Sequence, residues 1–136
     1  MKKFILIYLF FVVQLFGMSA ESKIMKLIFE SIFQKQVVIV FVDSEQKSDI
    51  IKDAGFVVAP SCSKADVIYT SDILEHCAQK PIFTDNYETF KQNRNVFGAF
   101  YWTKGRPNIM FDSKRMEVLE LILPENLKKY DIGLAK

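Results

Sequence analysis

Three aspartates, Asp43, Asp72 and Asp85, each stand at the point where an apolar run gives way to a polar segment. If the runs are parallel strands, the carboxylates share the edge of the sheet where ligands and metals bind in open α/β folds. A second interpretation is that each one caps a helix, since Gln or Glu follows three residues later in all three places. That capping-box spacing favours helix N-caps. We therefore predict neither catalytic residues nor metal ligands.

Other catalytic patterns are missing from the sequence. His76 is the single histidine, which excludes a zinc site built on several histidines. Serines are frequent, but a hydrolytic triad would lack its base, and the Gly-x-Ser-x-Gly motif does not occur. With five glycines in total there is no glycine-rich phosphate loop. We expect a non-enzymatic protein without a cofactor.

The N-terminus has the three-part pattern of a secretory signal. Lys2 and Lys3 precede an apolar run over residues 4–16, and Gly-Met-Ser-Ala, small except for Met18, follows up to position 20. The run is shorter than the roughly 20 residues that a membrane-spanning helix needs. We expect a signal peptide over residues 1–20, cleaved after Ser19 or Ala20. The domain over residues 21–136 would then work in the periplasm without stable membrane insertion.

Cleavage would also change the charge. The whole chain has 18 Lys and Arg residues against 16 Asp and Glu residues, and the signal contains two of the lysines. The remaining domain is formally neutral, so it lacks the basic surface that nucleic-acid binding needs. We expect no nucleic acid as a partner.

An exported chain with two cysteines favours a disulfide, here between Cys62 and Cys77. Cys62 precedes an expected strand over residues 65–70, and Cys77 ends the expected helix that returns from the far end of that strand. A compact return brings the two residues within bridging distance. The alternative is a pair of buried free thiols.

The periodicity predicts one α/β domain. Strands are expected over residues 37–42, 56–59, 65–70 and 81–84, and helices over 22–34, 43–54, 71–78 and 85–91. Alternating strands and helices indicate parallel β-α-β units. The apolar runs at 96–102 and 107–111 flank a Gly-containing turn and predict an antiparallel hairpin. The expected fold is a mixed, mostly parallel sheet of about five to six strands with flanking helices and a C-terminal antiparallel hairpin.

We expect the hairpin end and the C-terminal segment to form a partner-binding surface. Strand alternation places Phe100 and Trp102 on one face and Phe97 and Tyr101 on the other. Phe97 and Phe100 are expected in the core, while Trp102 beside the turn is expected to be partly exposed.

The individual residues that we expect to bind the partner are Trp102, Arg106 and Met110. Trp and Arg are enriched at binding hot spots. Met110 should point away from Ile109 and Phe111, either into the contact or beneath a helix over residues 113–121.

From Ala65 onward the order of elements resembles the YfiR/HmsC-like periplasmic regulators. The matching features are a strand after Cys62, the segments 80–85 and 95–112, and a tail that runs from Leu-Ile-Leu-Pro at 121–124 to Tyr130. The chain departs from the family at Met110, where the family favours Glu, at Asp112, where it favours Asn, and at Pro124, where it favours Ser. The N-terminal half matches only in element order.

The resemblance implies a periplasmic protein that binds the outer portion of an inner-membrane diguanylate cyclase and holds it inactive. Release of that cyclase would raise cyclic-di-GMP and favour biofilm. The alternative is a small ligand-binding domain that uses the cleft around Asp43, Ser71, Asp72 and Asp85. An acid-cluster hydrolase is a third, weaker interpretation, and the sequence leaves a homodimer open.

Overall fold

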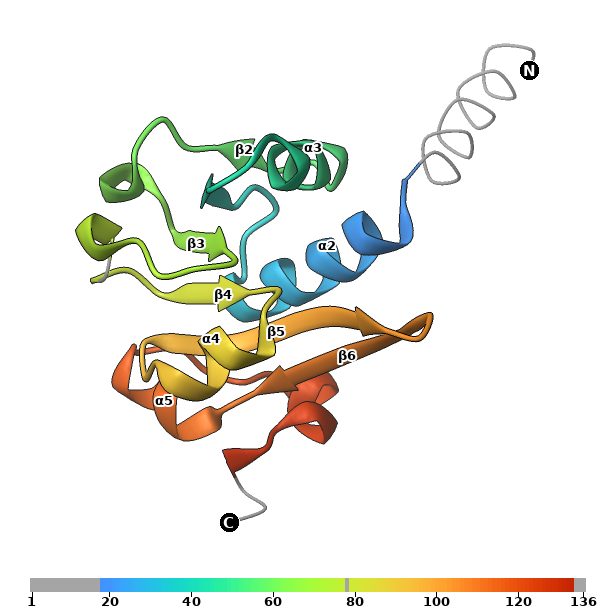
Figure 1. The fold of residues 1–136 in the computed structure, drawn as a ribbon, viewed down its shortest axis with the longest axis vertical. Coiled ribbons are helices and arrows are strands. Elements are labelled where there is room, and N and C mark those ends of the chain that lie inside the picture. The colour runs from blue at the N-terminus through green and yellow to red at the C-terminus, as the bar shows by residue number, and fades with distance from the viewer. Residues whose placement is uncertain (1–17, 78, 134–136) are drawn as a thin grey trace.

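The computed structural model describes residues 18–77 and 79–133 of the chain (Figure 1). Most of the expected signal peptide, residues 1–17, lies outside the described residues, so its cleavage remains a prediction. Within the described part no helix is long and apolar enough to cross a membrane. The elements in chain order are α2 (Ala20–Phe33), β1 (Ile39–Val42), α3 (Glu45–Asp53), β2 (Val57–Val58), η1 (Cys62–Lys64), β3 (Val67–Thr70), η2 (Glu75–Cys77), β4 (Ile82–Thr84), α4 (Tyr87–Gln92), β5 (Val96–Thr103), β6 (Arg106–Phe111), α5 (Ser113–Val118) and η3 (Glu125–Tyr130).

The strands form one six-stranded sheet in the order β2-β1-β3-β4-β5-β6. The first five strands are parallel to their neighbours, and β6 pairs with β5 in the antiparallel sense. The predicted α/β fold class is therefore confirmed, including the hairpin. The continuous apolar runs fit this position, because all the residues of β3 and β4 are buried between layers on both faces of the sheet.

Two apolar clusters pack on opposite faces of the sheet. The larger one includes α2, α3 and the C-terminal segment, with Phe29, Phe83, Phe97 and Phe111 fully buried. The smaller one lies beneath η1, η2 and α4 and contains both cysteines. In α2 the buried apolar residues are Met25, Ile28, Phe29 and Ile32, at helical spacing, whereas Leu27 is 53% exposed.

The expected helix over residues 71–78 does not form, and only the short 3₁₀ turn η2 is present. The first carbonyls of this segment accept hydrogen bonds from side chains. The Ser71 carbonyl accepts from the Thr89 hydroxyl at 2.7 Å, and the Asp72 carbonyl, at 2.5 Å, shares the single proton of the Thr70 hydroxyl with the Asp43 carboxylate. Threonine hydroxyls therefore satisfy groups that an α-helix would pair with its own amides.

A β-bulge changes the faces of β5. The pairing with β4 moves from Ile82–Val96 to Phe83–Gly98, which leaves Phe97 as an extra residue. Phe97 consequently packs in the same cluster as Phe100, so the prediction that it shares a face with Tyr101 is wrong. Gly98 is required here, because an added Cβ would lie 2.7 Å from Cδ1 of Phe111.

The hairpin turn is shorter than expected. Thr103 pairs with Arg106, so only Lys104 and Gly105 connect the strands. Both have positive φ, 52° and 77°, as a two-residue type I′ turn requires. The turn extends beyond the neighbouring strand β4 (Figure 1).

Candidate functional site

The three aspartates are not the helix caps that we expected. The side chain of Ser44 caps α3 by accepting from the Lys47 amide, and Asn86 caps α4 by accepting from the Glu88 amide. Asp43 and Asp85 each lie one residue earlier. Asp72 precedes no α-helix in the described chain. The capping prediction is therefore wrong, and two of these carboxylates have a different role.

Asp43 and Asp85 bind the same cation, Lys47 in the first turns of α3. Its ammonium nitrogen lies 3.2 Å from Oδ1 of Asp43 and 3.3 Å from Oδ2 of Asp85. It also donates to the hydroxyl of Ser71 at 2.8 Å. The lysine side chain is only 8% exposed. Three acceptors thus surround a group that has three protons to donate.

Backbone and side-chain donors hold Asp43 in its charged form. Burial by itself raises the pKa of this carboxyl. The Ser71 amide, the Thr70 hydroxyl and the charge of Lys47 more than offset burial, so the net pKa lies below its ordinary value. The two hydrogen bonds measure 2.9 and 2.8 Å. Asp43 therefore joins the carboxyl end of β1 to that of β3.

The cluster lies at the point where the strand order reverses. The chain passes from β1 outward to β2, and β3 then pairs with the opposite side of β1. In open α/β sheets this switch point, at the carboxyl ends of the strands, is where ligands bind. Asp43 follows β1, Ser71 follows β3 and Asp85 follows β4. The topology therefore brings together three of the four residues named for the alternative ligand-binding cleft.

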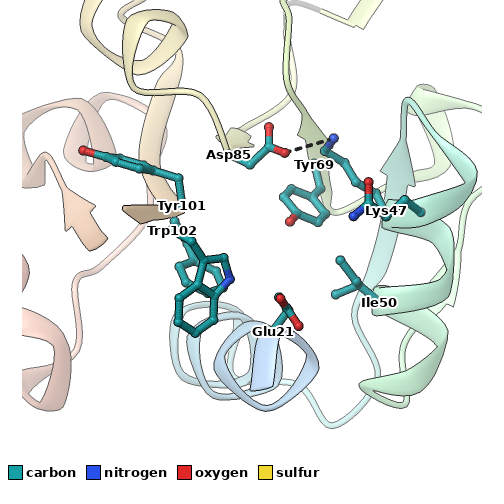
Figure 2. Close-up of a pocket in the computed structure, with 9 residues that line it drawn as sticks. Glu21, Lys47, Ile50, Tyr69, Asp85, Tyr101 and Trp102 are labelled. Atoms are coloured by element: carbon teal, nitrogen blue, oxygen red, sulfur yellow. Dashed lines mark ion pairs between the residues drawn. The ribbon is translucent and has the colours of Figure 1, made fainter. Parts of the chain in front are cut away.

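A cavity of about 250 Å³ opens beside this cluster (Figure 2). Its walls come from α2, α3, β3, β5 and the end of β4. The lining residues are Glu21, Gln46, Lys47, Ile50, Tyr69, Asp85, Phe100, Tyr101 and Trp102. Figure 2 shows the Tyr69 hydroxyl directed into the space between Glu21, Ile50 and Trp102.

The hairpin residues that we predicted for partner binding lie on different faces. Trp102 packs against Phe100 with ring centroids 5.6 Å apart, on the side of the larger cluster, and is 41% exposed. Met110 is half-buried against the smaller cluster, opposite to Ile109 and Phe111 as expected. Arg106 is exposed and, by strand alternation, shares the face of Met110. No single flat surface can include all three.

The C-terminal segment is also separated from the hairpin end. Thr103 pairs with Arg106 at the turn, whereas Gly98 pairs with Phe111 at the other end of β6. Helix α5 begins just after Phe111. The predicted partner surface therefore divides into the hairpin tip and a separate region around α5.

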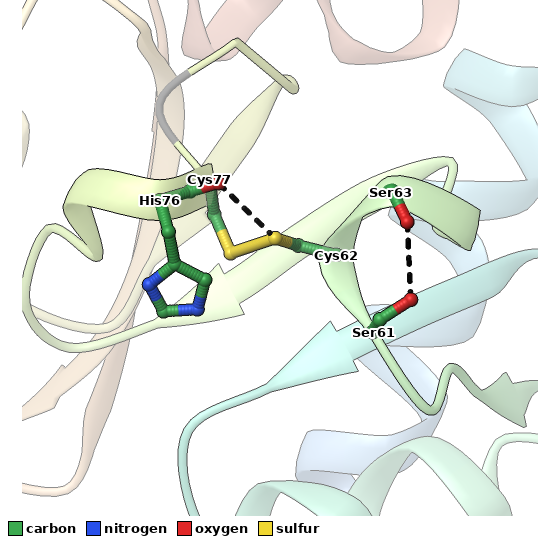
Figure 3. The surroundings of a disulfide bond; sticks show 5 residues. All are labelled: Ser61, Cys62, Ser63, His76 and Cys77. Atoms are coloured by element: carbon green, nitrogen blue, oxygen red, sulfur yellow. Dashed lines mark hydrogen bonds between the residues drawn. A yellow bond between two sulfur atoms is a disulfide. The ribbon is translucent and has the colours of Figure 1, made fainter.

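The disulfide between Cys62 and Cys77 is present, with Cα atoms 5.6 Å apart, and it connects η1 to η2 (Figure 3). Sγ of Cys62 also lies 3.5 Å from the His76 carbonyl oxygen. Cys62, His76 and Cys77 present potential ligand atoms within 4.8 Å of one another. The two sulfurs are bonded to each other and offer no thiolate, so this group is not a metal site in the oxidised protein.

Sequence reasoning missed Glu21, Lys47 and Tyr69 as site residues. Lys47 had a signal, because it stands four residues after Asp43, a spacing that pairs opposite charges. Glu21 and Tyr69 had none: they belong to α2 and β3, and only the tertiary fold brings them to one cavity.

Fold and site together define a doubly wound α/β domain with a polar cluster and a cavity at its switch point. Neither a family model nor a curated protein matches the sequence. Among solved structures, the fold is similar to a conserved domain protein from Vibrio cholerae, with a TM-score of 0.58 and 12% sequence identity. The alignment covers 84% of this chain and 60% of that one, so the present chain spans less than two thirds of its neighbour. At this identity the likeness concerns the fold alone.

Proposed function

We propose that the protein is an exported, non-enzymatic regulator that binds the outer portion of an inner-membrane signalling protein and restrains it. The resemblance to the YfiR/HmsC-like regulators makes a diguanylate cyclase the expected partner. The observation that carries the proposal is the β5–β6 hairpin, whose tip extends beyond β4 (Figure 1). The strand pairing places Arg106 and the 41%-exposed Trp102 beside its turn. A rigid hairpin that presents these residue types suits protein recognition.

The position of β6 adds to this support. It is an edge strand of the sheet, and in the described chain only Phe111 at its far end bridges to another segment, at Asp131. Pro107 lacks an amide proton, which limits uncontrolled strand pairing at this edge. The exposed side chains of the tip are therefore the elements available for a specific contact.

The direct test is cellular cyclic-di-GMP in the source organism. Deleting the gene should raise cyclic-di-GMP and biofilm, and wild-type protein should restore the original level. If deletion leaves cyclic-di-GMP unchanged, this function is refuted.

Two variants then locate the contact. Met110→Glu and Arg106→Ala alter one face of the hairpin, and Lys52→Ala, at an exposed position of α3 away from the hairpin, is the matched control. If the Met110 face is the interface, the first two variants should fail to restore cyclic-di-GMP at normal protein level and melting temperature. A Met110→Glu protein that unfolds would indicate a core role. A folded variant that still restores the level would remove this face from the interface.

A small-ligand-binding function is the second candidate, and a specific observation favours it. The cavity of about 250 Å³ lies at the switch point and is lined by both charged and aromatic side chains. Ligand binding and partner regulation are compatible, because Trp102 belongs both to the cavity and to the hairpin.

A further inference from the structure

None of the side chains that line the cavity offers a free cationic donor to an anionic ligand. Lys47 is the only ammonium group among the lining residues, and its three neighbours are Asp43, Asp85 and Ser71. With three protons and three acceptors it has no proton to give to a phosphate or carboxylate. The chemistry of the cavity must therefore be decided by its other groups.

The other charged side chains at the cavity are carboxylates. Glu21 lines the cavity from α2 and has no hydrogen-bond or ion-pair partner among the described residues. The side chain of Asp85 is 36% exposed, so its oxygens retain room for a further donor. Counting Asp43, three carboxylates stand against the Lys47 ammonium group and, once the signal is cleaved, the α-amino group at the start of α2. The excess negative charge favours a cation.

The Tyr69 hydroxyl is an independent sign that the cavity accepts a ligand. Tyr69 is only 3% exposed, its hydroxyl points into the cavity, and no described residue forms a hydrogen bond with it (Figure 2). Burial, together with the charges of Asp85, Glu21 and Asp43, raises the pKa of this phenol far above its ordinary value. The group therefore stays neutral, and its hydroxyl, which remains accessible from the cavity, can form a hydrogen bond with a ligand there.

Aromatic rings supply the rest of the wall. Phe100 and Trp102 lie side by side, and Trp102 remains 41% exposed at the opening. One face of the Tyr69 ring already contacts the Lys47 ammonium, 5.5 Å from the ring centroid. Aromatic faces combined with carboxylates recognise organic ammonium groups. A divalent metal would instead need a shell of six or more oxygen ligands.

We propose that this cavity binds a small organic ammonium ion, with Glu21 and Asp85 balancing its charge and Trp102 and Phe100 covering its methyl or methylene groups. The proposal rests on the second candidate function and names its ligand class. At about 250 Å³ the cavity is smaller than the roughly 300–1,000 Å³ usual for drug-sized ligands, so the occupant is small.

The chain contains a built-in reporter, because Trp102 is its single tryptophan. Choline is the probe, and 3,3-dimethyl-1-butanol is its uncharged analogue of the same shape. Titration of the mature protein with choline should change the Trp102 fluorescence to saturation. The uncharged analogue should bind about 2- to 30-fold more weakly, the range that corresponds to a cation–π contact.

Variants assign the binding to the cavity. Glu21→Gln keeps the shape and removes one charge, and should weaken choline binding by a similar factor. Glu117→Gln, on the exposed side of α5, is the matched control and should bind like wild type. Because Trp102→Ala and Trp102→Phe lack the fluorescent reporter, calorimetry measures their choline binding. Trp102→Ala should bind choline more weakly than Trp102→Phe.

Equal binding of choline and its neutral analogue would overturn the proposal, as would the absence of saturable choline binding to the folded protein. A Mg²⁺ or Ca²⁺ response without a choline response would overturn it in favour of an acidic metal site. Each result is independent of the cyclic-di-GMP measurement, so failure of the ligand class and failure of the regulatory function can be told apart.

Discussion

Replacing Lys47 with Met should destabilise the fold through unpaired charge rather than through packing. Methionine keeps a long unbranched side chain but lacks the ammonium group, so Asp43 and Asp85 lose their shared cation. Breaking a buried ion pair by removing one partner costs about 3–5 kcal/mol. Because the two carboxylates are 19% and 36% exposed, water compensates in part. We expect a loss of about 3 kcal/mol at pH 7.

Urea unfolding followed by far-ultraviolet circular dichroism measures this loss. Lys52→Met is the matched control, because Lys52 is exposed on the same helix, and it should cost less than about 1 kcal/mol. An Asp43→Asn background should reduce the cost of Lys47→Met, because only Asp85 is then left unpaired.

The pH dependence separates charge from packing. The pKa of the Asp43 carboxyl is lower in the folded chain than its ordinary value of 3.8, which applies to the unfolded chain. Such a carboxyl stabilises the fold fully at a pH above its unfolded-chain pKa, and this stabilisation is lost as the pH falls through its folded-chain pKa. Lys47→Met removes a nearby positive charge and so weakens the preference of the Asp43 carboxyl for its charged form. The difference in the free energy of unfolding between wild type and Lys47→Met should therefore shrink as the pH falls below 3.8. An equal difference at pH 7 and in acid would refute the electrostatic argument.

Three further predictions concern other parts of the chain. Non-reduced peptide mapping should show Cys62 linked to Cys77. Replacing both cysteines by Ser should lower the free energy of unfolding by about 3 kcal/mol, as expected for a 15-residue separation. A reduced protein as stable as the oxidised one would contradict this. Gly98→Ala should lower the melting temperature, because its Cβ would lie 2.7 Å from the Phe111 ring; an unchanged value would show that the ring moves freely. N-terminal sequencing of the exported protein should begin at Ala20 or Glu21, and full-length chain in the membrane fraction would contradict cleavage.

The strands and the hairpin could be predicted because their signals are local. Continuous β-branched and aromatic runs identify buried strands, and Lys104-Gly105 supplies the positive φ angles of the turn. The Cys62–Cys77 disulfide was also predicted correctly, although the return between the two cysteines contains the 3₁₀ turn η2 in place of the expected helix. Each of these features is decided within about 20 residues of chain, where spacing alone constrains the geometry.

Tertiary structure decided which polar residue caps a helix and which one connects two strands. Ser44 and Asp43 are adjacent and both suit an N-cap, so helix propensity cannot choose between them. Ser44 caps the helix because donors from β3 and the Lys47 ammonium bind Asp43, and those donors come from 27 and 28 residues away or across the helix turn. Similarly, alternation along β5 could not reveal the bulge at Phe97, since a bulge depends on pairing with β4.

The cavity is the clearest example of a feature that local sequence signals could not predict and that depends on the tertiary structure. Glu21, Tyr69 and Trp102 belong to α2, β3 and β5, and no spacing along the chain connects them. They meet because parallel strands bring their carboxyl ends to one edge of the sheet and α2 packs its N-terminal turn against that edge. The sequence by itself determined the strands and their order along the chain, but not the segment over residues 71–78, where a helix was expected and only a 3₁₀ turn forms. The acidic, aromatic-lined cavity arose only when the sheet order placed three distant segments side by side.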